Sequence, residues 1–249
     1  MKNVYTLSLT LVILSFLAVK AQKGFEIGPT YQVQSTWMLN SDDTNSGQDL
    51  DYVNTFATAY GVQLGYGFHA RHGLRVGLLM SQQGQEYTTS SEFLELPNTK
   101  YFTNTEYLQI PVLYRYNGNL RIANSAFILT VGPQFGMLQS ATGTKLIRDT
   151  ILTTAALTPE FDQKKLLNSM DVSAHLGLGI LARFSPTFHM NATLNFDYSI
   201  NDIEASAFKM PNRAITRNAV VSLNVGFFLL LGGPGMALPG PAKTCWMKF

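Results

Sequence analysis

The stretch "TEYLQIPVLYRY", residues 105–116, alternates between two kinds of side chain. The row that contains Leu108 and Ile110 is apolar and aromatic, whereas the other row contains Gln109, Pro111 and Arg115. Successive side chains of a β-strand point to opposite faces, so this period of two predicts a strand. Its two faces must therefore meet different surroundings.

The same alternation recurs eight times along the chain. One row of each segment is large and apolar, and the opposite row is small or polar. This pattern predicts strands rather than helices, and no later segment has the 18 consecutive apolar residues that a membrane-spanning helix needs. The expected strands lie near residues 25–38, 56–69, 74–87, 105–117, 125–138, 171–184, 187–200 and 216–231.

Composition and targeting narrow the class of protein. Charged residues make up 14% of the 249 residues, against about 25% in a typical soluble protein. The net charge of +2 and the absence of a basic stripe give no indication of a nucleic-acid partner. Lys2, an apolar run over residues 7–19 and small residues before Gln22 predict a signal peptide at 1–21, and hence export. The single cysteine excludes a disulfide framework.

The connections decide between a soluble exported β-protein and a membrane barrel. Short links near 71–73, 118–124 and 185–186 alternate with long ones near 39–55, 88–104, 139–170 and 201–215. Outer-membrane barrels have short periplasmic turns and long outer loops, whereas a two-sheet sandwich has no reason for such alternation. We therefore expect an all-β, eight-stranded antiparallel up-and-down transmembrane barrel over residues 22–232, in the lipid of a bacterial outer membrane. A Gly- and Pro-rich tail, 233–249, follows it.

In such a barrel the large apolar rows face lipid and the small or polar rows fill the narrow lumen. Unpaired buried charges are costly, so the lumen side chains should pair with one another. Arg75, Arg115 and Arg183 could alternatively form a ring that attracts anions. The expected lumen network consists of Glu26, Arg75, Gln109, Arg115, Asp171, His175, Arg183 and Asp197.

The sequence predicts no catalytic, metal or cofactor site. Asp171, Ser173 and His175 share one face of one strand, but steps of about 6–7 Å are too long for direct hydrogen bonds. Pro111 removes a ladder hydrogen bond in the middle of a strand, so we expect a local bulge or bend there.

The motif "YLQIPVLYRY" and the stretch "VGPQFG" (131–136) resemble the PorT-like outer-membrane β-barrel family of the Bacteroidetes. The family usually carries an acidic residue where Gln109 stands. The resemblance implies an eight-stranded barrel in the outer membrane, and the family's namesake takes part in type IX secretion. The matching residues are Tyr107, Leu108, Gln109, Ile110, Pro111, Arg115 and Tyr116.

Three functions follow as hypotheses. The first is a non-enzymatic structural or accessory role in the envelope, with the barrel as a monomer. The second is a PorT-like part in type IX secretion through contacts with other envelope or secretion-system proteins. The third is an adhesin or ligand-binding barrel that acts through its long outer loops, above all 139–170.

Overall fold

The computed structural model describes residues 24–42, 51–69, 71–88, 100–120, 124–148, 155–157 and 161–231. The expected signal peptide, 1–21, and the tail, 233–249, lie outside these ranges. Within the described ranges no helix is long and apolar enough to cross a membrane.

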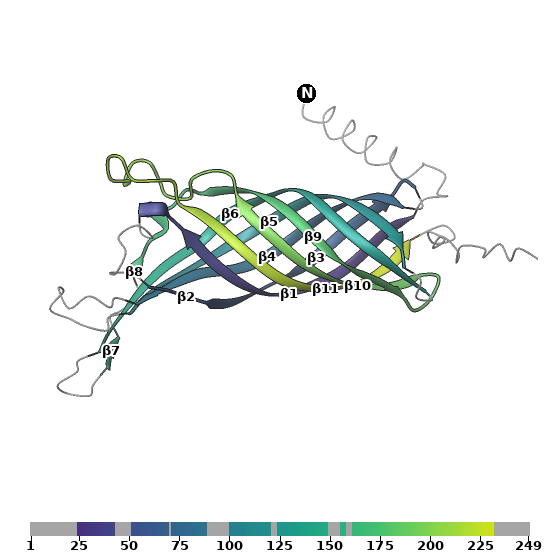
Figure 1. The fold of residues 1–249 in the computed structure, drawn as a ribbon, viewed down its shortest axis with the longest axis horizontal. Coiled ribbons are helices and arrows are strands. Elements are labelled where there is room, and N and C mark those ends of the chain that lie inside the picture. Colours follow the sequence, from purple (N-terminus) through teal and green to yellow (C-terminus); the bar gives the residue numbers. More distant parts are fainter. Residues whose placement is uncertain are drawn as a thin grey trace, which may run out of the picture.

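Eight long strands form one closed antiparallel ring (Figure 1). Each of these strands pairs with the next long strand along the chain, and the first closes the ring against the last. The prediction of an eight-stranded antiparallel up-and-down barrel is therefore confirmed. The strands are β1 (Phe25–Leu39), β3 (Thr55–Gly67), β4 (His72–Thr88), β5 (Lys100–Asn119), β6 (Ser125–Arg148), β9 (Met170–Arg183), β10 (Phe188–Ser199) and β11 (Arg217–Leu231).

Short elements cluster at the end of the barrel that carries the long connections (Figure 1). Strand β2 (Asp51–Val53) pairs with β4, while β7 (Ala155–Leu157) and β8 (Phe161–Asp162) pair with β6. A 3-10 helix, η1, spans Lys164–Leu166. We call this the outer end. The short connections lie at the opposite end, where β1 begins and β11 ends.

Two strands are longer than expected. Strand β5 begins at Lys100 and β6 continues to Arg148, so parts of the expected loops 88–104 and 139–170 are strand. A tilted strand needs about 9–11 residues to cross a membrane. With 20 and 24 residues, β5 and β6 extend well past the outer end of the apolar band.

The sequence predicts a bulge or bend at Pro111; no bulge lies there, although the pairing of β5 with β4 and with β6 is interrupted at or beside this residue. Pro111 pairs with Gln134, and the register is unchanged where pairing resumes at Tyr114. The register shift falls between Glu106 and Tyr107, opposite the additional residue Gln139 of β6. The sheet thus accommodates the extra residue, Gln139, in its outer part. The ring of Pro111 points into the lumen.

The two faces of the wall differ sharply in chemistry. Outward-facing side chains along the middle of the barrel are large, apolar and solvent-accessible in the isolated chain, among them Leu64, Leu78, Leu178, Leu194 and Leu223. Inward-facing side chains are mostly amides, hydroxyls and charged groups, and they are buried. The barrel thus has its polar core inside and its apolar surface outside.

Candidate functional site

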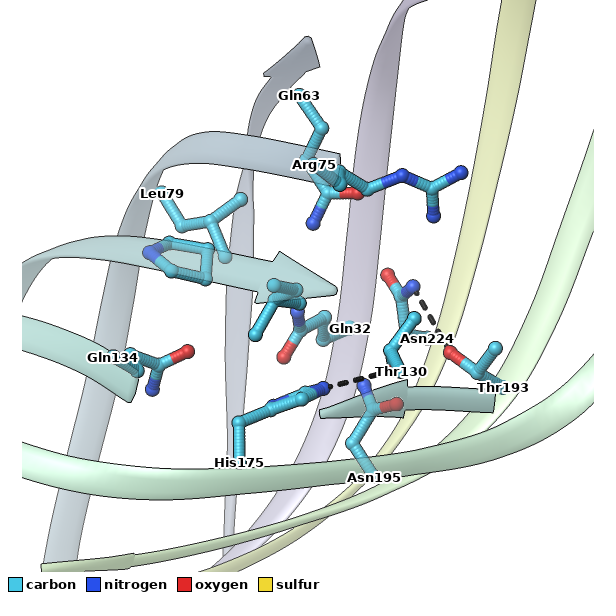
Figure 2. A pocket seen from close by; sticks show the side chains of 12 residues that line it. Gln32, Gln63, Arg75, Leu79, Thr130, Gln134, His175, Thr193, Asn195 and Asn224 are labelled. Carbon is cyan, nitrogen blue, oxygen red and sulfur yellow. Dashed lines mark hydrogen bonds between the residues drawn. The ribbon is translucent and has the colours of Figure 1, made fainter. Parts of the chain in front are cut away.

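Side chains from several strands converge on the middle of the lumen (Figure 2). There, amide, hydroxyl and imidazole groups converge with the apolar Leu79, Pro111 and Leu113 on a void of only about 10 Å³. That volume holds about one water molecule. The described lumen therefore offers no continuous passage at this level.

Glu26 is the centre of a buried charge cluster toward the short-turn end. Its Oε1 accepts a hydrogen bond from Arg75 Nη2 at 2.7 Å and another from Arg115 Nη1. His189 Nε2 lies 3.3 Å from the second carboxylate oxygen. We call these four residues the Glu26 cluster. They come from β1, β4, β5 and β10, so one carboxylate links four strands across the lumen.

Neighbouring side chains complete the surroundings of Arg75. The guanidinium lies over the ring of Phe228, 4.3 Å from its centroid, in a cation–π contact. With its amide oxygen turned toward Arg75, Asn191 accepts hydrogen bonds from Nη2 at 2.6 Å and Nη1 at 2.9 Å. The ring of His189 stacks on the same Phe228 ring, and the two ring centroids are 5.4 Å apart.

A second cluster lies nearer the outer end. His175 Nδ1 is 2.6 Å from Asp197 Oδ1, and His175 Nε2 is 3.2 Å from Thr130 Oγ1. As expected from the spacing along the strand, Asp171 and Ser173 are not hydrogen-bond partners of His175, whose partners come from the adjoining strands β10 and β6. An Asp–His–hydroxyl chain could in principle activate the hydroxyl as a nucleophile. The void beside it has no room for a substrate.

The remaining predicted lumen residues are more dispersed. Asp171 accepts a hydrogen bond from Asn218 at 2.9 Å, close to the outer end, and Gln109 is buried in the lumen. Arg183 is only half-buried at the short-turn end, where no described carboxylate pairs with it. Arg75 and Arg115 meet at Glu26, and Arg183 is not part of this cluster.

The motif residues divide between the two faces. Tyr107, Gln109, Pro111 and Arg115 are buried inside, whereas Leu108, Ile110 and Tyr116 occupy the outward row. The lumen network predicted from the sequence does not include Thr130, Asn191 and Asn218. Each lies on an inward row of its strand, so parity alone could have included them, but it could not have identified their partners.

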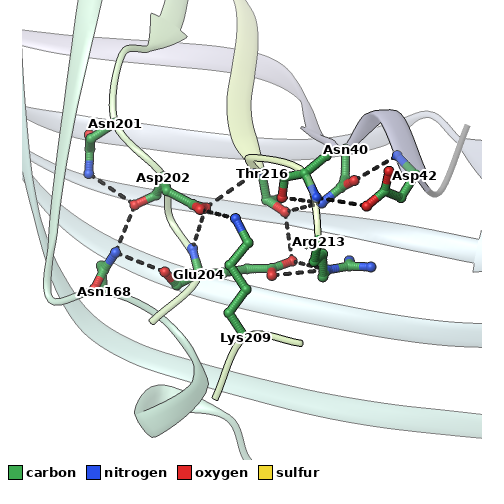
Figure 3. A network of polar contacts seen from close by, with 10 residues as sticks. Asn40, Asp42, Asn168, Asn201, Asp202, Glu204, Lys209, Arg213 and Thr216 are labelled. Atoms are coloured by element: carbon green, nitrogen blue, oxygen red, sulfur yellow. Dashed lines mark hydrogen bonds and ion pairs between the residues drawn. The ribbon is translucent and has the colours of Figure 1, made fainter. Parts of the chain in front are cut away.

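The connection from β10 to β11, residues 200–216, is held by a polar network at the outer end (Figure 3). Asp202 accepts backbone hydrogen bonds from Glu204 at 3.0 Å and Thr216 at 3.1 Å, and its other oxygen pairs with Lys209. Arg213 Nε lies 3.0 Å from both carboxylate oxygens of Glu204. We call this connection the outer cap.

Two amide side chains attach the outer cap to the barrel. Asn40, just after β1, donates to Thr216 Oγ1 at 2.6 Å. Asn168, just before β9, donates to the carbonyl oxygens of Asp202 at 2.8 Å and Glu204 at 2.9 Å. Burial alone would raise the pKa of Asp202, but hydrogen bonds from Lys209 and from backbone N–H groups lower it below its usual range. The sequence predicts the outer cap only as a long connection, near 201–215.

A cavity of about 270 Å³ opens beside the outer cap. Its walls combine apolar side chains with the paired charges of the polar network, and they include Met38, Leu167, Ile203, Phe208, Met210 and Arg213. Phe208 and Met210 are also strongly exposed. Among the described residues, no group of three or more His, Cys, Asp or Glu side chains could hold a metal ion.

A closed barrel with an apolar exterior and a polar, packed interior defines an integral membrane β-barrel. The outer membrane protein beta-barrel domain family matches residues 19–204, so the chain belongs to this family. The protein is accordingly located in the bacterial outer membrane. No curated protein matches the sequence.

Several solved outer-membrane barrels are similar to the chain at low sequence identity. Neisserial surface protein A is 10% identical, with a TM-score of 0.39 over 81% of this chain and 95% of its own. OprG from Pseudomonas aeruginosa is 11% identical, with a TM-score of 0.40 over 84% and 96%. Ail from Yersinia pestis, in complex with a heparin analogue, is 10% identical, with a TM-score of 0.36 over 82% and 98%.

Proposed function

We propose that the protein is a non-enzymatic structural or accessory component of the outer membrane that conducts no solute through its lumen. The observation that carries this proposal is the filled lumen. Glu26 links β1, β4, β5 and β10, and the mid-lumen void holds no more than about one water molecule. An eight-stranded barrel is only just wide enough for its own side chains.

Planar-bilayer recording tests this role. Folded protein, verified by heat-modifiable gel mobility, should give no discrete conductance steps, whereas a porin inserted in the same bilayer should conduct. Reproducible steps that change in Arg115→Ala would contradict a closed barrel. The small void also supports the non-enzymatic part of the proposal. It leaves no space in which a substrate could meet the Thr130 hydroxyl of the Asp197–His175–Thr130 chain.

Ligand binding at the outer side is a second candidate, favoured by the cavity of about 270 Å³ beside the outer cap. A ligand-binding role needs a preformed hollow on a rigid support, and the network around Asp202 supplies the support. Simultaneous Phe208→Ala and Met210→Ala substitution should abolish surface contact with a host cell or a second bacterium while the barrel stays folded. Unchanged attachment would reject this candidate.

A PorT-like part in type IX secretion is the finer assignment that the motif at 107–116 supports. Deletion of the gene should then reduce the export of several unrelated proteins. The secreted proteins of the deletion strain, compared with those of a complemented strain by mass spectrometry, provide the test. An identical set of secreted proteins would remove this assignment.

A further inference from the structure

The outer part of β4 departs from its neighbour β3. The ladder between these strands ends at the pair Ala59–Ser81, and β2 pairs with β4 only from Glu86 onward. In the interval, Thr36 of β1 hydrogen-bonds with the backbone of Gly84, donating to its carbonyl at 2.7 Å and accepting from its N–H at 3.1 Å. Since β3 separates β1 from β4 in the ring, β4 must bend inward to reach this side chain.

Further side chains of β1 hold the bent segment. Gln34 donates to the Ser81 hydroxyl at 2.9 Å and to the carbonyl of Gln82. The backbone N–H of Met38 donates to Gln85 Oε1 at 3.2 Å. These contacts hold β4 where its ladder with β3 is interrupted. Beyond the interruption, the N–H of Glu86 donates to Thr55 Oγ1 of β3 at 3.2 Å.

A groove of about 390 Å³ begins where the ladder between β3 and β4 is interrupted and runs across the outer parts of β5 and β6. Amide and hydroxyl groups dominate its lining, and the described lining residues include one carboxylate and no cation. Phe56 stands at its edge with 77% of the side chain exposed. The Oε1 atom of Gln83 is buried in the lining without a hydrogen-bond partner. The lining of the groove includes Phe56, Gln82, Gln83, Asn104, Glu106 and Ser140.

The position of the groove along the barrel points to its occupant. On the outward rows, Gln82 follows Met80, and Glu106 precedes Leu108 on the neighbouring strand. Met80 and Met137 are apolar and exposed at this level, so the groove lies directly above the lipid-facing band. Side chains at that boundary meet the headgroups of the outer leaflet. Where the outer leaflet of an outer membrane consists of glycolipid, its headgroups contain sugars.

We propose that this groove binds a neutral sugar unit of an outer-leaflet glycolipid. The amides of Gln82, Gln83 and Asn104 can donate to and accept from sugar hydroxyls. The exposed face of Phe56 can pack against the C–H groups of the ring. Glu106, with no cation in the lining, repels phosphate and favours an uncharged sugar.

Calorimetry on folded, full-length mature protein in detergent micelles tests the proposal. The probes are a rough lipopolysaccharide, its deacylated and dephosphorylated core oligosaccharide, and inorganic phosphate. The oligosaccharide should bind saturably. Phe56→Ala and Asn104→Ala should each weaken its binding about fivefold or more, which corresponds to about 1 kcal/mol. Phe184→Ala, a strongly exposed aromatic at the short-turn end, is the matched control and should leave the affinity unchanged.

Each other outcome overturns the proposal. Absence of saturable oligosaccharide binding would do so, as would unchanged affinity in Phe56→Ala. Binding of intact lipopolysaccharide without binding of the oligosaccharide would show that the acyl chains, rather than the sugar, are recognised. Displacement of the oligosaccharide by phosphate would show an anion site. Heat-modifiable mobility of every variant establishes that a loss of binding does not reflect a misfolded barrel.

Discussion

Glu26 on β1 lies directly across the ladder from Gly65 on β3, and the glycine leaves the space that the carboxylate occupies. A Cβ atom at residue 65 would lie 2.4 Å from Glu26 Oε1 and 2.5 Å from its Cγ. The missing side chain on one strand thus allows the charged side chain on the next to reach Arg75 and Arg115.

Gly65→Ala should therefore destabilise the folded barrel, by about 1–3 kcal/mol, the usual cost of overpacking. Urea unfolding in detergent micelles, followed by gel mobility, measures the change. Gly118→Ala is the matched control, because a Cβ atom there meets only ordinary contacts of 3.5 Å or more. Equal effects of the two substitutions would contradict the packing argument.

Glu26→Gln should be more damaging, because it leaves two buried guanidinium groups without a counter-charge. Breaking a buried ion pair on one side costs about 3–5 kcal/mol. Glu86→Gln is the control, since its ion pair with Lys100 is partly exposed and should contribute about 1 kcal/mol or less. The same unfolding assay compares the two, and similar losses would show that the Glu26 cluster is not the main link across the lumen.

An arginine introduced on the outward face should reveal which face meets lipid. Leu194 lies in the middle of β10 and is 59% exposed in the isolated chain. Leu194→Arg should destabilise insertion by about 2–4 kcal/mol, the cost near the bilayer midplane. Phe208→Arg, outside the strands in the outer cap, should have little effect. A harmless Leu194→Arg would mean that this row faces water or protein.

The outer cap should loosen in acid. The folded-state pKa of Asp202 lies below its unfolded value of about 3.9, so its stabilising contribution is complete above that pH. The contribution declines as the pH falls through the lowered pKa. Backbone amide signals of Glu204 and Thr216, followed by NMR from about pH 6 to 2, should report this transition. Asp202→Asn should abolish it, and a transition that persists in this variant would assign it to another group.

Much of the fold follows from the sequence because the period of two is a local property. Alternation at Tyr107–Tyr116 predicts both the strand and the side on which Arg115 lies, and the structure has Arg115 fully buried inside. The alternating lengths of the connections indicate the closed ring. Strand ends are less well predicted, because polar outward residues such as Asn104 of β5 and Ser140 of β6 lack the apolar signal. The pairing between β5 and β6 nevertheless keeps them in the sheet.

Alternation by itself predicted that eight segments are strands and divided each into two opposite rows, since neighbouring residues in an extended chain must face opposite sides. The alternating lengths of the connections then indicated that the polar rows point inward. Only the tertiary structure decided which inward residues meet. Glu26 reaches Arg115 of a distant strand, and His175 pairs with Asp197 rather than Asp171. The bend of β4 toward Thr36 likewise depends on contacts across the ring. Such partners follow from the stagger and closure of the barrel, which no local pattern records.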